Sequence, residues 1–367
     1  MAVLSTVRSY DREMMCGEPA TTFGFSHPGY MHTAVIPSTD AGYSRQLHYR
    51  VGSPEVGWSQ AFSFTAPFTF LVFNDVGQEN SVLFNDTCPP YCPGGWAWVD
   101  YTANSTKLGQ HLMREDEASL GLLVGDLSYA NGVQADWDYF GHQFQAPFSR
   151  WPLMVATGNH ERDQPHTGDV LNDASSDSGG ECNVPYTYSL PTALNPYKSY
   201  YSFSMATVHF LMLDSESPSH KGSPQHSFVL QDLAKVDRSK HPWLVVGCHR
   251  MMAGPTTNPV NVQNMARLQA DYEELFKQHA VDQVLQDPQA PVYVLAGHAG
   301  AGFTHAFPAV LPGWVAFGVQ DQNGYVRVTV SGNKLTMASI STDDGHVIDA
   351  AAAMERAAQV VAGTFNR

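Results

Sequence analysis

The stretch Leu153-Met154-Val155-Ala156-Thr157-Gly158-Asn159-His160-Glu161 turns from an apolar run into an amide, an imidazole and a carboxylate. Three other apolar runs end in polar side chains in a comparable way: residues 70–73 before Asp75-Val76-Gly77, residues 120–124 before Gly125-Asp126-Leu127-Ser128-Tyr129, and residues 243–246 before Gly247-Cys248-His249. Continuous apolar runs are typical of buried parallel strands, and open α/β sheets hold ligands at the carboxyl ends of such strands. The sequence therefore predicts that metal-binding side chains meet at one end of a sheet.

The order and context of these motifs resemble those of the metallophosphoesterases, and specifically the plant-type purple acid phosphatases. The resemblance extends over about residues 10–349. It implies an α+β/α/β architecture: a fibronectin-III-like β-sandwich, of which only a remnant is present, followed by a two-sheet αββα metallophosphoesterase domain. It also implies a binuclear centre of Fe(III) with Zn(II), Mn(II) or Fe(II), in which a metal-bound hydroxide attacks a phosphate monoester.

Five side chains match the family's metal ligands: Asp75, Asp126, Tyr129, Asn159 and His249. By resemblance, Asp126 bridges the metals, Asp75 and Tyr129 bind the iron, and the remaining two bind the divalent ion. His160 would hydrogen-bond or protonate the leaving group, and we expect Glu161 to support its loop as an acceptor. Any one of these residues alone has an ordinary alternative, such as a helix N-cap for an aspartate or core packing for Tyr129. Four motifs in order make coincidence a poor explanation.

A further family motif, Gly-His-x-His, is missing from its expected place. The strand-like Val281-Asp282-Gln283-Val284-Leu285 runs directly into Gln286 and the residues up to Pro291, which we interpret as an internal deletion. Each metal would lose one histidine, and losses even outside the ligand set typically reduce affinity or activity about 10 to 100-fold. One substitute ligand is His298, if residues 291–296 slide into the missing strand's position. The alternative is that His298 is a turn residue after the family's later Pro-Val-Tyr strand.

We therefore expect a metal-dependent acid phosphatase whose catalysis is impaired in this chain. Two alternatives stay open: a catalytically inactive family member with a binding or regulatory role, and a nucleotide pyrophosphatase or phosphodiesterase, because the same bimetal core serves diesters. The expected partner is a small phosphate ester, and a homodimer is compatible with the family. The resemblance implies a secreted or vacuolar protein, although residues 1–11 lack the apolar core of a signal peptide.

The composition excludes some classes of partner. Against 20 basic residues stand 35 acidic ones, a net charge of −15, which argues against binding to nucleic acid or to an anionic membrane. No apolar run approaches the roughly 18 residues of a membrane span. The five cysteines leave one unpaired if disulfides form, which suits a secreted ancestor, but reduced structural thiols are an equal alternative.

The family resemblance, together with the strand patterns, implies four regions: a truncated β-sandwich over 1–66, the catalytic domain over 67–310, its β-rich C-terminal part over 311–350, and a tail helix over 351–367. Within them, alternation predicts a half-buried strand over 58–64. It also predicts two strands over 325–330 and 334–340, which are joined by a hairpin turn and close the second sheet.

The catalytic region contains one clear helical pattern and two inserts. The helical pattern lies over residues 261–279. The first insert, residues 79–105, carries Cys88 and Cys92, whose spacing suggests a plain loop or a loop disulfide. The second insert, residues 163–185, is rich in Asp, Ser and Gly, and we expect it to overhang the active site.

Overall fold

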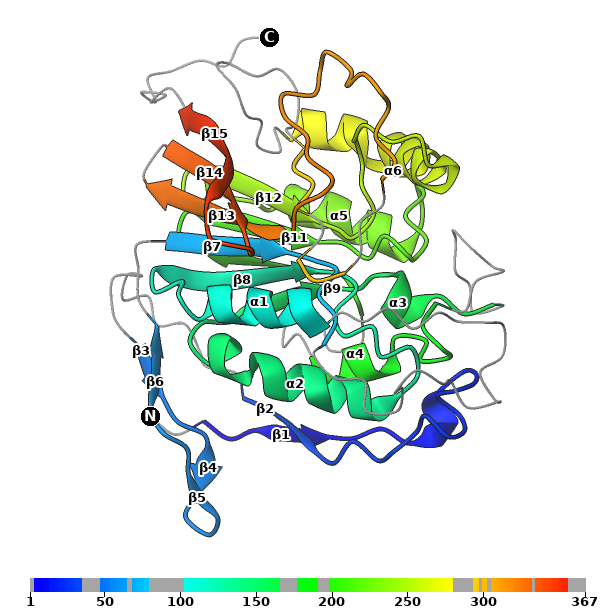
Figure 1. Cartoon of the computed structure of the whole chain (residues 1–367), viewed down its shortest axis with the longest axis vertical. Helices are drawn as coiled ribbons and strands as arrows, with labels where there is room; N and C mark the ends of the chain where they lie inside the picture. Colours follow the sequence, from blue (N-terminus) through cyan, green and yellow to red (C-terminus); the bar gives the residue numbers. More distant parts are fainter. Residues whose placement is uncertain are drawn as a thin grey trace.

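The computed structural model describes residues 3–34, 47–64, 68–78, 102–165, 177–190, 198–279, 293–296, 299–301, 305–331 and 334–355. Within these ranges the catalytic region has four layers, with helices outside and two β-sheets face to face between them (Figure 1). This αββα arrangement confirms the fold predicted for the catalytic domain. None of the described helices is both long enough and apolar enough to cross a bilayer.

The larger sheet has six strands in the order β15-β14-β13-β7-β8-β9. Three of them are parallel and are the predicted apolar runs: β7 (Phe68–Phe73), β8 (Ala118–Val124) and β9 (Leu153–Ala156). Every residue of β8 is buried, as expected for a central strand that is covered on both faces. The other three strands are antiparallel: β13 (Gly324–Ser331), β14 (Lys334–Ser341) and β15 (Val347–Glu355).

In the described part of the chain, the smaller sheet has three strands: β10 (Tyr201–Met205), β11 (Val208–Met212) and β12 (Trp243–Gly247). Strand β12 is the fourth predicted apolar run, and it pairs with β11 in parallel. Because β12 is parallel to its neighbour, its carboxyl end carries the residues that follow it to one edge of the sheet.

Three apolar clusters hold the layers together. The middle cluster lies between the sheets and includes Phe70 and Leu122 from the larger sheet and Phe210 and Trp243 from the smaller one. An outer cluster packs α1 (Thr102–Leu112) and α2 (Gln134–Phe148) on the larger sheet. The third packs α5 (Pro224–Leu233) and α6 (Pro259–Gln278) on the smaller sheet. The long apolar strands thus form the core, and their polar ends remain for the site.

Local sequence explains where the two helices on the smaller sheet begin. In α5 the side chain of Ser223 accepts a hydrogen bond from the backbone N–H of His226, and Pro224 follows at the first helical position. In α6 the side chain of Asn258 accepts from the N–H groups of Val260 and Asn261. Both starts combine a side-chain cap with a proline whose missing N–H costs nothing there. The helix α6 confirms the predicted helix over 261–279 to within two residues.

The C-terminal strands require two corrections. The predicted hairpin strands form as β13 and β14, but β13 pairs with β7, so they extend the larger sheet and do not close the second one. The predicted tail helix is wrong for residues 351–355, which continue β15. Hydrogen bonding to β14 outweighs the helix propensity of alanine there. Residues 356–367 lie outside the described part of the chain.

The described N-terminal residues form three separate two-stranded sheets. These pair β1 (Thr6–Arg8) with β2 (Met31–Thr33), β3 (Leu47–Tyr49) with β6 (Phe62–Phe64), and β4 (Gly52–Ser53) with β5 (Gly57–Trp58). A short 3₁₀ helix, η1, covers Arg12–Met14. The predicted strand over 58–64 is wrong as one element, because β5 ends at Trp58 and β6 begins at Phe62. The β-sandwich itself is not confirmed.

Candidate metal centre

Two aspartates follow the central strands in an uncommon backbone conformation. Asp75, just after β7, has φ 55° and Asp126, just after β8, has φ 52°. The left-handed region is uncommon for residues other than glycine, and such strained residues concentrate at functional sites. The two strand ends also bind each other, since the N–H of Val76 donates to the carbonyl of Asp126 over 3.0 Å. The backbone therefore fixes where both carboxylates point.

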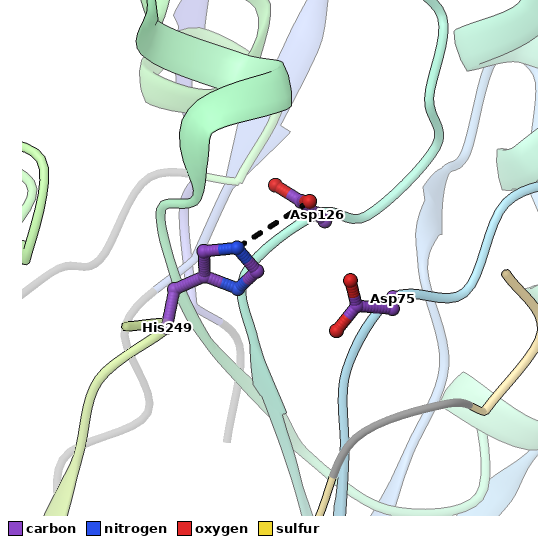
Figure 2. A group of neighbouring side chains, drawn as sticks. All are labelled: Asp75, Asp126 and His249. Carbon is purple, nitrogen blue, oxygen red and sulfur yellow. Dashed lines mark ion pairs between the residues drawn. The ribbon is translucent and has the colours of Figure 1, made fainter. Parts of the chain in front are cut away.

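The predicted metal ligands lie together. Ligand atoms of Asp75, Asp126 and His249 lie within 4.8 Å of one another (Figure 2). The hydroxyl of Tyr129 donates to Asp75 Oδ1 over 2.8 Å and to Asp126 Oδ2 over 3.1 Å. Nε2 of His249 is 3.1 Å from Asn159 Oδ1 and 3.4 Å from Asp126 Oδ2. Asp126 thus lies between one pair of predicted ligands, Asp75 and Tyr129, and another pair, Asn159 and His249. A ligand that bridges two metals would occupy this position. Their role as ligands stays a prediction.

The orientation of His249 suits metal binding. Its Nδ1 lies 3.2 Å from the carbonyl oxygen of Val124, which can only accept, so Nδ1 carries a proton. The other ring nitrogen, Nε2, therefore faces the carboxylates of Asp75 and Asp126. The ring fits because residue 125 is glycine, where an added Cβ would lie 2.6 Å from His249 Cβ. A histidine held in this way is ready to coordinate a cation through Nε2.

Charge attraction dominates the titration of this pair. Burial alone would lower the pKa of His249, but the charges of Asp126 and Asp75 raise it to about 10. Burial alone would raise the pKa of Asp126, but His249 and His160 hold it well below its usual range. Without a metal, the imidazolium therefore supplies the positive charge that compensates the buried carboxylate.

Glu161 supports the loops, as predicted. It belongs to the short helix α3 (Asn159–Arg162), is 1% exposed, and accepts from the backbone N–H groups of Asp126, Leu127 and Gly158 over 3.0, 2.8 and 2.9 Å. Burial, followed by the charge of Asp126, raises its pKa to about 8, against the effect of these donors. A single carboxyl group thereby joins the end of β8 to the start of α3.

His160 lies beside the predicted ligands, on the aromatic ring of Tyr129. The two ring centroids are 4.3 Å apart, and the backbone N–H of His160 donates to Asp126 Oδ1 over 3.0 Å. Its Nδ1 is 2.8 Å from Oδ1 of Asn131, another residue with positive φ, at 48°. The imidazole is thus fixed at the edge of the site, consistent with the predicted contact to a leaving group.

Two residues near the site were missed by the sequence analysis. Asp177 accepts a hydrogen bond from Asn159 Nδ2 over 3.0 Å, so the described part of the second insert does reach the site. Arg250, which follows His249, donates through Nε to Glu216 Oε1 over 3.0 Å. Its Nη2 lies 3.7 Å from Asp163 Oδ2. Its position next to a predicted ligand was the available signal. For Asp177 the signal was only the acidic composition of the insert.

A cavity of about 680 Å³ opens at this site and extends between the two sheets. Asp75, His160, His249 and Arg250 line its polar part, whereas strand residues such as Val328 line its apolar part. The volume lies within the usual range of small-molecule sites.

The substitute ligand His298, with Gly297, lies outside the described residues. So do residues 280–292, where the Gly-His-x-His motif is missing from the sequence. The residues after His298 are described: the N–H groups of Gly300 and Ala301 donate to the carbonyl of Asp75 over 2.9 and 2.7 Å. The segment that follows His298 is therefore attached to a predicted metal ligand.

The sequence left the cysteine pairing open. Cys16 and Cys182 form a disulfide between the N-terminal segment and the second insert, and Cys248 is the free cysteine among the described residues. Burial raises the pKa of the Cys248 thiol to about 12, which makes it unreactive. Cys88 and Cys92 lie outside the described residues.

The donor set fits the metals that the family resemblance implies. Asp126, Asn159 and His249 offer two oxygens and an imidazole nitrogen, a combination that suits Zn²⁺ or Mn²⁺. Asp75, Asp126 and Tyr129 offer only oxygens, which suit a hard ion. The two sets of ligands share the carboxylate of Asp126. This arrangement suits two neighbouring metals with one bridging ligand.

Two family models match this chain, and both belong to phosphoesterases. Residues 68–300 match the family model "Calcineurin-like phosphoesterase", and residues 290–350 match "Iron/zinc purple acid phosphatase-like protein C". The two matches overlap over residues 290–300. The described residues 293–296 are not in a strand, so the predicted strand over 291–296 is wrong for them.

Individual relatives differ in the activity that their names state. "Probable inactive purple acid phosphatase 1" from Arabidopsis thaliana is 28% identical over 93% of this chain and 60% of its own length. A "Nucleotide pyrophosphatase/phosphodiesterase" from Hordeum vulgare is 26% identical over 80% of this chain and 87% of its own length. The structure of a purple acid phosphatase from yellow lupin seeds matches with a TM-score of 0.76 and 26% identity, over 94% of this chain and 66% of that one.

Proposed function

Because the chain belongs to the calcineurin-like phosphoesterases, within the purple acid phosphatase family, we propose that it is a metal-dependent acid phosphatase with impaired catalysis. Its substrate would be a small phosphate monoester. The observation that carries the proposal is the convergence of five metal-binding side chains, with Asp126 at their centre, from the ends of β7, β8 and β12 and the start of α3.

The positions of the residues support a role for each of them in the proposed reaction. We assign the divalent ion to Asp126, Asn159 and His249, and the iron to Asp126, Asp75 and Tyr129. When bound, the two ions would polarise the phosphoryl oxygens and lower the pKa of coordinated water. His160 is held by Asn131 and by the Tyr129 ring, so that it can donate a hydrogen bond to the leaving oxygen.

Impairment follows from the ligand count. Without the Gly-His-x-His motif, three protein ligands remain for each metal when Asp126 is counted twice. Three ligands are enough for a catalytic zinc site, but the iron side would have no nitrogen ligand at all. We therefore expect the divalent ion to bind more readily than iron. The relative named as a probable inactive phosphatase supports low activity.

A second enzymatic function has a specific observation in its favour. The barley relative, named a nucleotide pyrophosphatase/phosphodiesterase, matches over most of both chains. The large cavity beside the metal centre offers room for a leaving group larger than an alcohol. A binding or regulatory role without catalysis is the remaining candidate.

Location and assembly are also proposals. The disulfide between Cys16 and Cys182 supports an oxidising compartment, such as the secretory route or the vacuole that the family resemblance implies. A homodimer stays compatible with the family.

The proposal is tested by metal analysis and turnover on the same preparation. The chain is stripped of metal, incubated with Zn²⁺ or Mn²⁺, and assayed for bound metal and for hydrolysis of p-nitrophenyl phosphate and of bis-p-nitrophenyl phosphate. We expect bound divalent metal and slow monoester hydrolysis that His160→Ala and His249→Gln both reduce. Faster diester hydrolysis would favour the second enzymatic function. Bound metal without turnover would favour the binding role, and absence of both would contradict the proposal.

A further inference from the structure

The amide of Asn159 can bind a metal only through one of its two ends. Its oxygen is a ligand, whereas its NH₂ group is a donor that repels a cation. The oxygen, Oδ1, lies on the side of His249 Nε2, at 3.1 Å. The nitrogen, Nδ2, points to the carboxylate of Asp177, at 3.0 Å from Oδ2. A carboxylate only accepts hydrogen bonds, so the flipped amide would place two oxygens against each other.

The loop that carries Asp177 is itself firmly held. Glu181, 2% exposed, accepts from the N–H of Gly132 over 2.8 Å and from the indole N–H of Trp137 over 3.0 Å. The N–H of Asn183 donates to the carbonyl of Glu161 over 2.6 Å. These bonds attach the loop to α2, to the loop before it, and to α3, the helix that contains Asn159.

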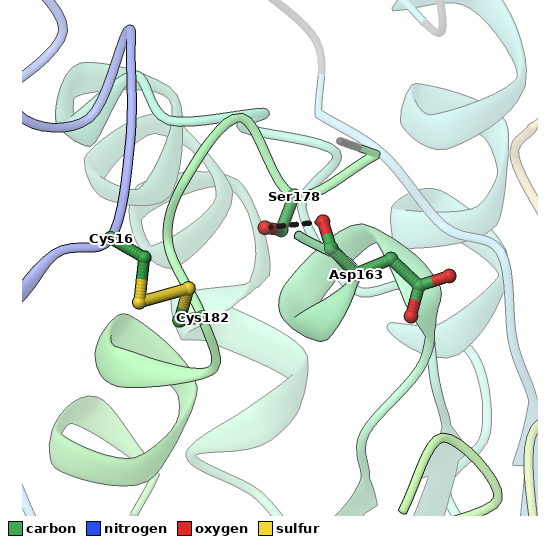
Figure 3. The surroundings of a disulfide bond; sticks show 4 residues. All are labelled: Cys16, Asp163, Ser178 and Cys182. Carbon is green, nitrogen blue, oxygen red and sulfur yellow. Dashed lines mark hydrogen bonds between the residues drawn. A yellow bond between two sulfur atoms is a disulfide. The ribbon is translucent and has the colours of Figure 1, made fainter. Parts of the chain in front are cut away.

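The N-terminal segment adds a covalent attachment. Cys182 is bonded to Cys16, and the N–H of Cys16 donates to the carbonyl of Gly180 over 2.7 Å. On the other side of the loop, the hydroxyl of Ser178, next to Asp177, donates to the carbonyl of Asp163 over 2.9 Å (Figure 3). The segment that directly follows Asp177 is thus fixed at several points, all independent of the Asn159 side chain.

From these contacts we propose that Asp177 is a positioning residue: it holds the Asn159 amide so that the carbonyl oxygen, and not the NH₂ group, faces the divalent metal. The inference rests on the metal site of the proposed function. Outer hydrogen-bond partners of metal ligands typically contribute about 10 to 100-fold to metal affinity, and we expect a loss of that size without Asp177.

The sharpest variant is Asp177→Asn, which keeps the shape of the side chain. Its NH₂ group can donate to Asn159 Oδ1 and so stabilise the flipped amide, with the wrong end toward the metal. We expect the full chain to bind Zn²⁺ at least about 10-fold more weakly by calorimetric titration, and Asp177→Glu to recover part of the affinity. The matched control is Ser178→Ala, which alters the same loop but not the contact with Asn159, and should bind Zn²⁺ like the unmodified chain.

A second measurement does not depend on metal. In metal-free protein labelled with ¹⁵N at asparagine, the side-chain NH₂ signal of Asn159 should shift in Asp177→Ala and stay in place in Ser178→Ala. An unmoved signal would overturn the inference, as would equal Zn²⁺ affinity of Asp177→Ala, which has no acceptor for the Asn159 amide, and the unmodified chain. If the unmodified chain binds no metal but the signal shifts as expected, the proposed metal site fails, whereas the positioning contact stands.

Discussion

Binding of a divalent metal should release about one proton near neutral pH, and His249 should be its source. With a pKa of about 10, the imidazole is almost fully protonated at pH 7.5 in the metal-free protein. A metal can bind Nε2 only after that proton leaves, because coordination requires neutral histidine. Between pH 7 and 9, the apparent affinity for Zn²⁺ should therefore rise about tenfold per pH unit. If the pKa of His249 were not raised, the apparent affinity for Zn²⁺ would change little with pH above 7.5.

The assay is calorimetric titration with Zn²⁺ in several non-chelating buffers of different ionisation enthalpy. The slope of the apparent enthalpy against buffer enthalpy gives the number of protons released. We expect about one for the unmodified chain and for Tyr129→Phe, and a number near zero for His249→Gln. A value near zero for the unmodified chain at pH 7.5, with measurable binding, would refute the assignment of the buried charge to His249.

The same linkage acts on folding: the raised pKa of His249 stabilises the metal-free fold fully below pH 6.5, and this contribution should be lost as pH rises toward 10, measured as a falling melting temperature. Glu161→Ala leaves three buried N–H groups without their acceptor, which should cost at least about 3 kcal/mol in urea unfolding; an unchanged midpoint would contradict the supporting role. In an absorption spectrum, the metal-loaded chain should show no visible tyrosinate-to-iron band. A purple preparation with two metals per chain would refute the interpretation that two ligand histidines have been lost by deletion. Insertion of a Gly-His-x-His loop between Leu285 and Gln286 should raise phosphomonoesterase turnover by orders of magnitude, whereas His298→Ala should change it little; loss of a robust activity in His298→Ala would instead make that residue a true ligand.

The strand ends of the site were predictable because the signal is local. An apolar run marks a buried strand, and the polar residues after it must emerge at its carboxyl end, whatever the rest of the chain does. The contact of Glu161 with its own loop was predictable for the same reason, since Glu161 lies in the short helix just after β9, close to the backbone N–H of Gly158. These inferences needed no knowledge of which strands are neighbours.

The errors arose where the answer depends on distant partners. Alanines 350–353 favour a helix by propensity, but β14 offers them an edge to pair with. The pairing of β13 with β7 joins residues that are far apart in sequence, which periodicity does not encode. The disulfide spans 166 residues, and its connectivity cannot be deduced from cysteine spacing. Asp177 was missed because its proposed role depends on one hydrogen bond with Asn159, which no local sequence pattern indicates.

The geometry also indicates which part of the site the missing motif should affect. The described contacts that hold Asp126, Asn159 and His249 come from elsewhere: Glu161 joins the loops of Asp126 and Asn159, the carbonyl of Val124 orients His249, and Asp177 accepts from the Asn159 amide. None of these partners belongs to the segment after Leu285. We therefore expect the arrangement of these three ligands to be independent of the absent histidines, so that their absence reduces metal affinity and turnover without disturbing the fold. Restoring two ligands should then repair the chain, which is why the inserted loop is the decisive variant.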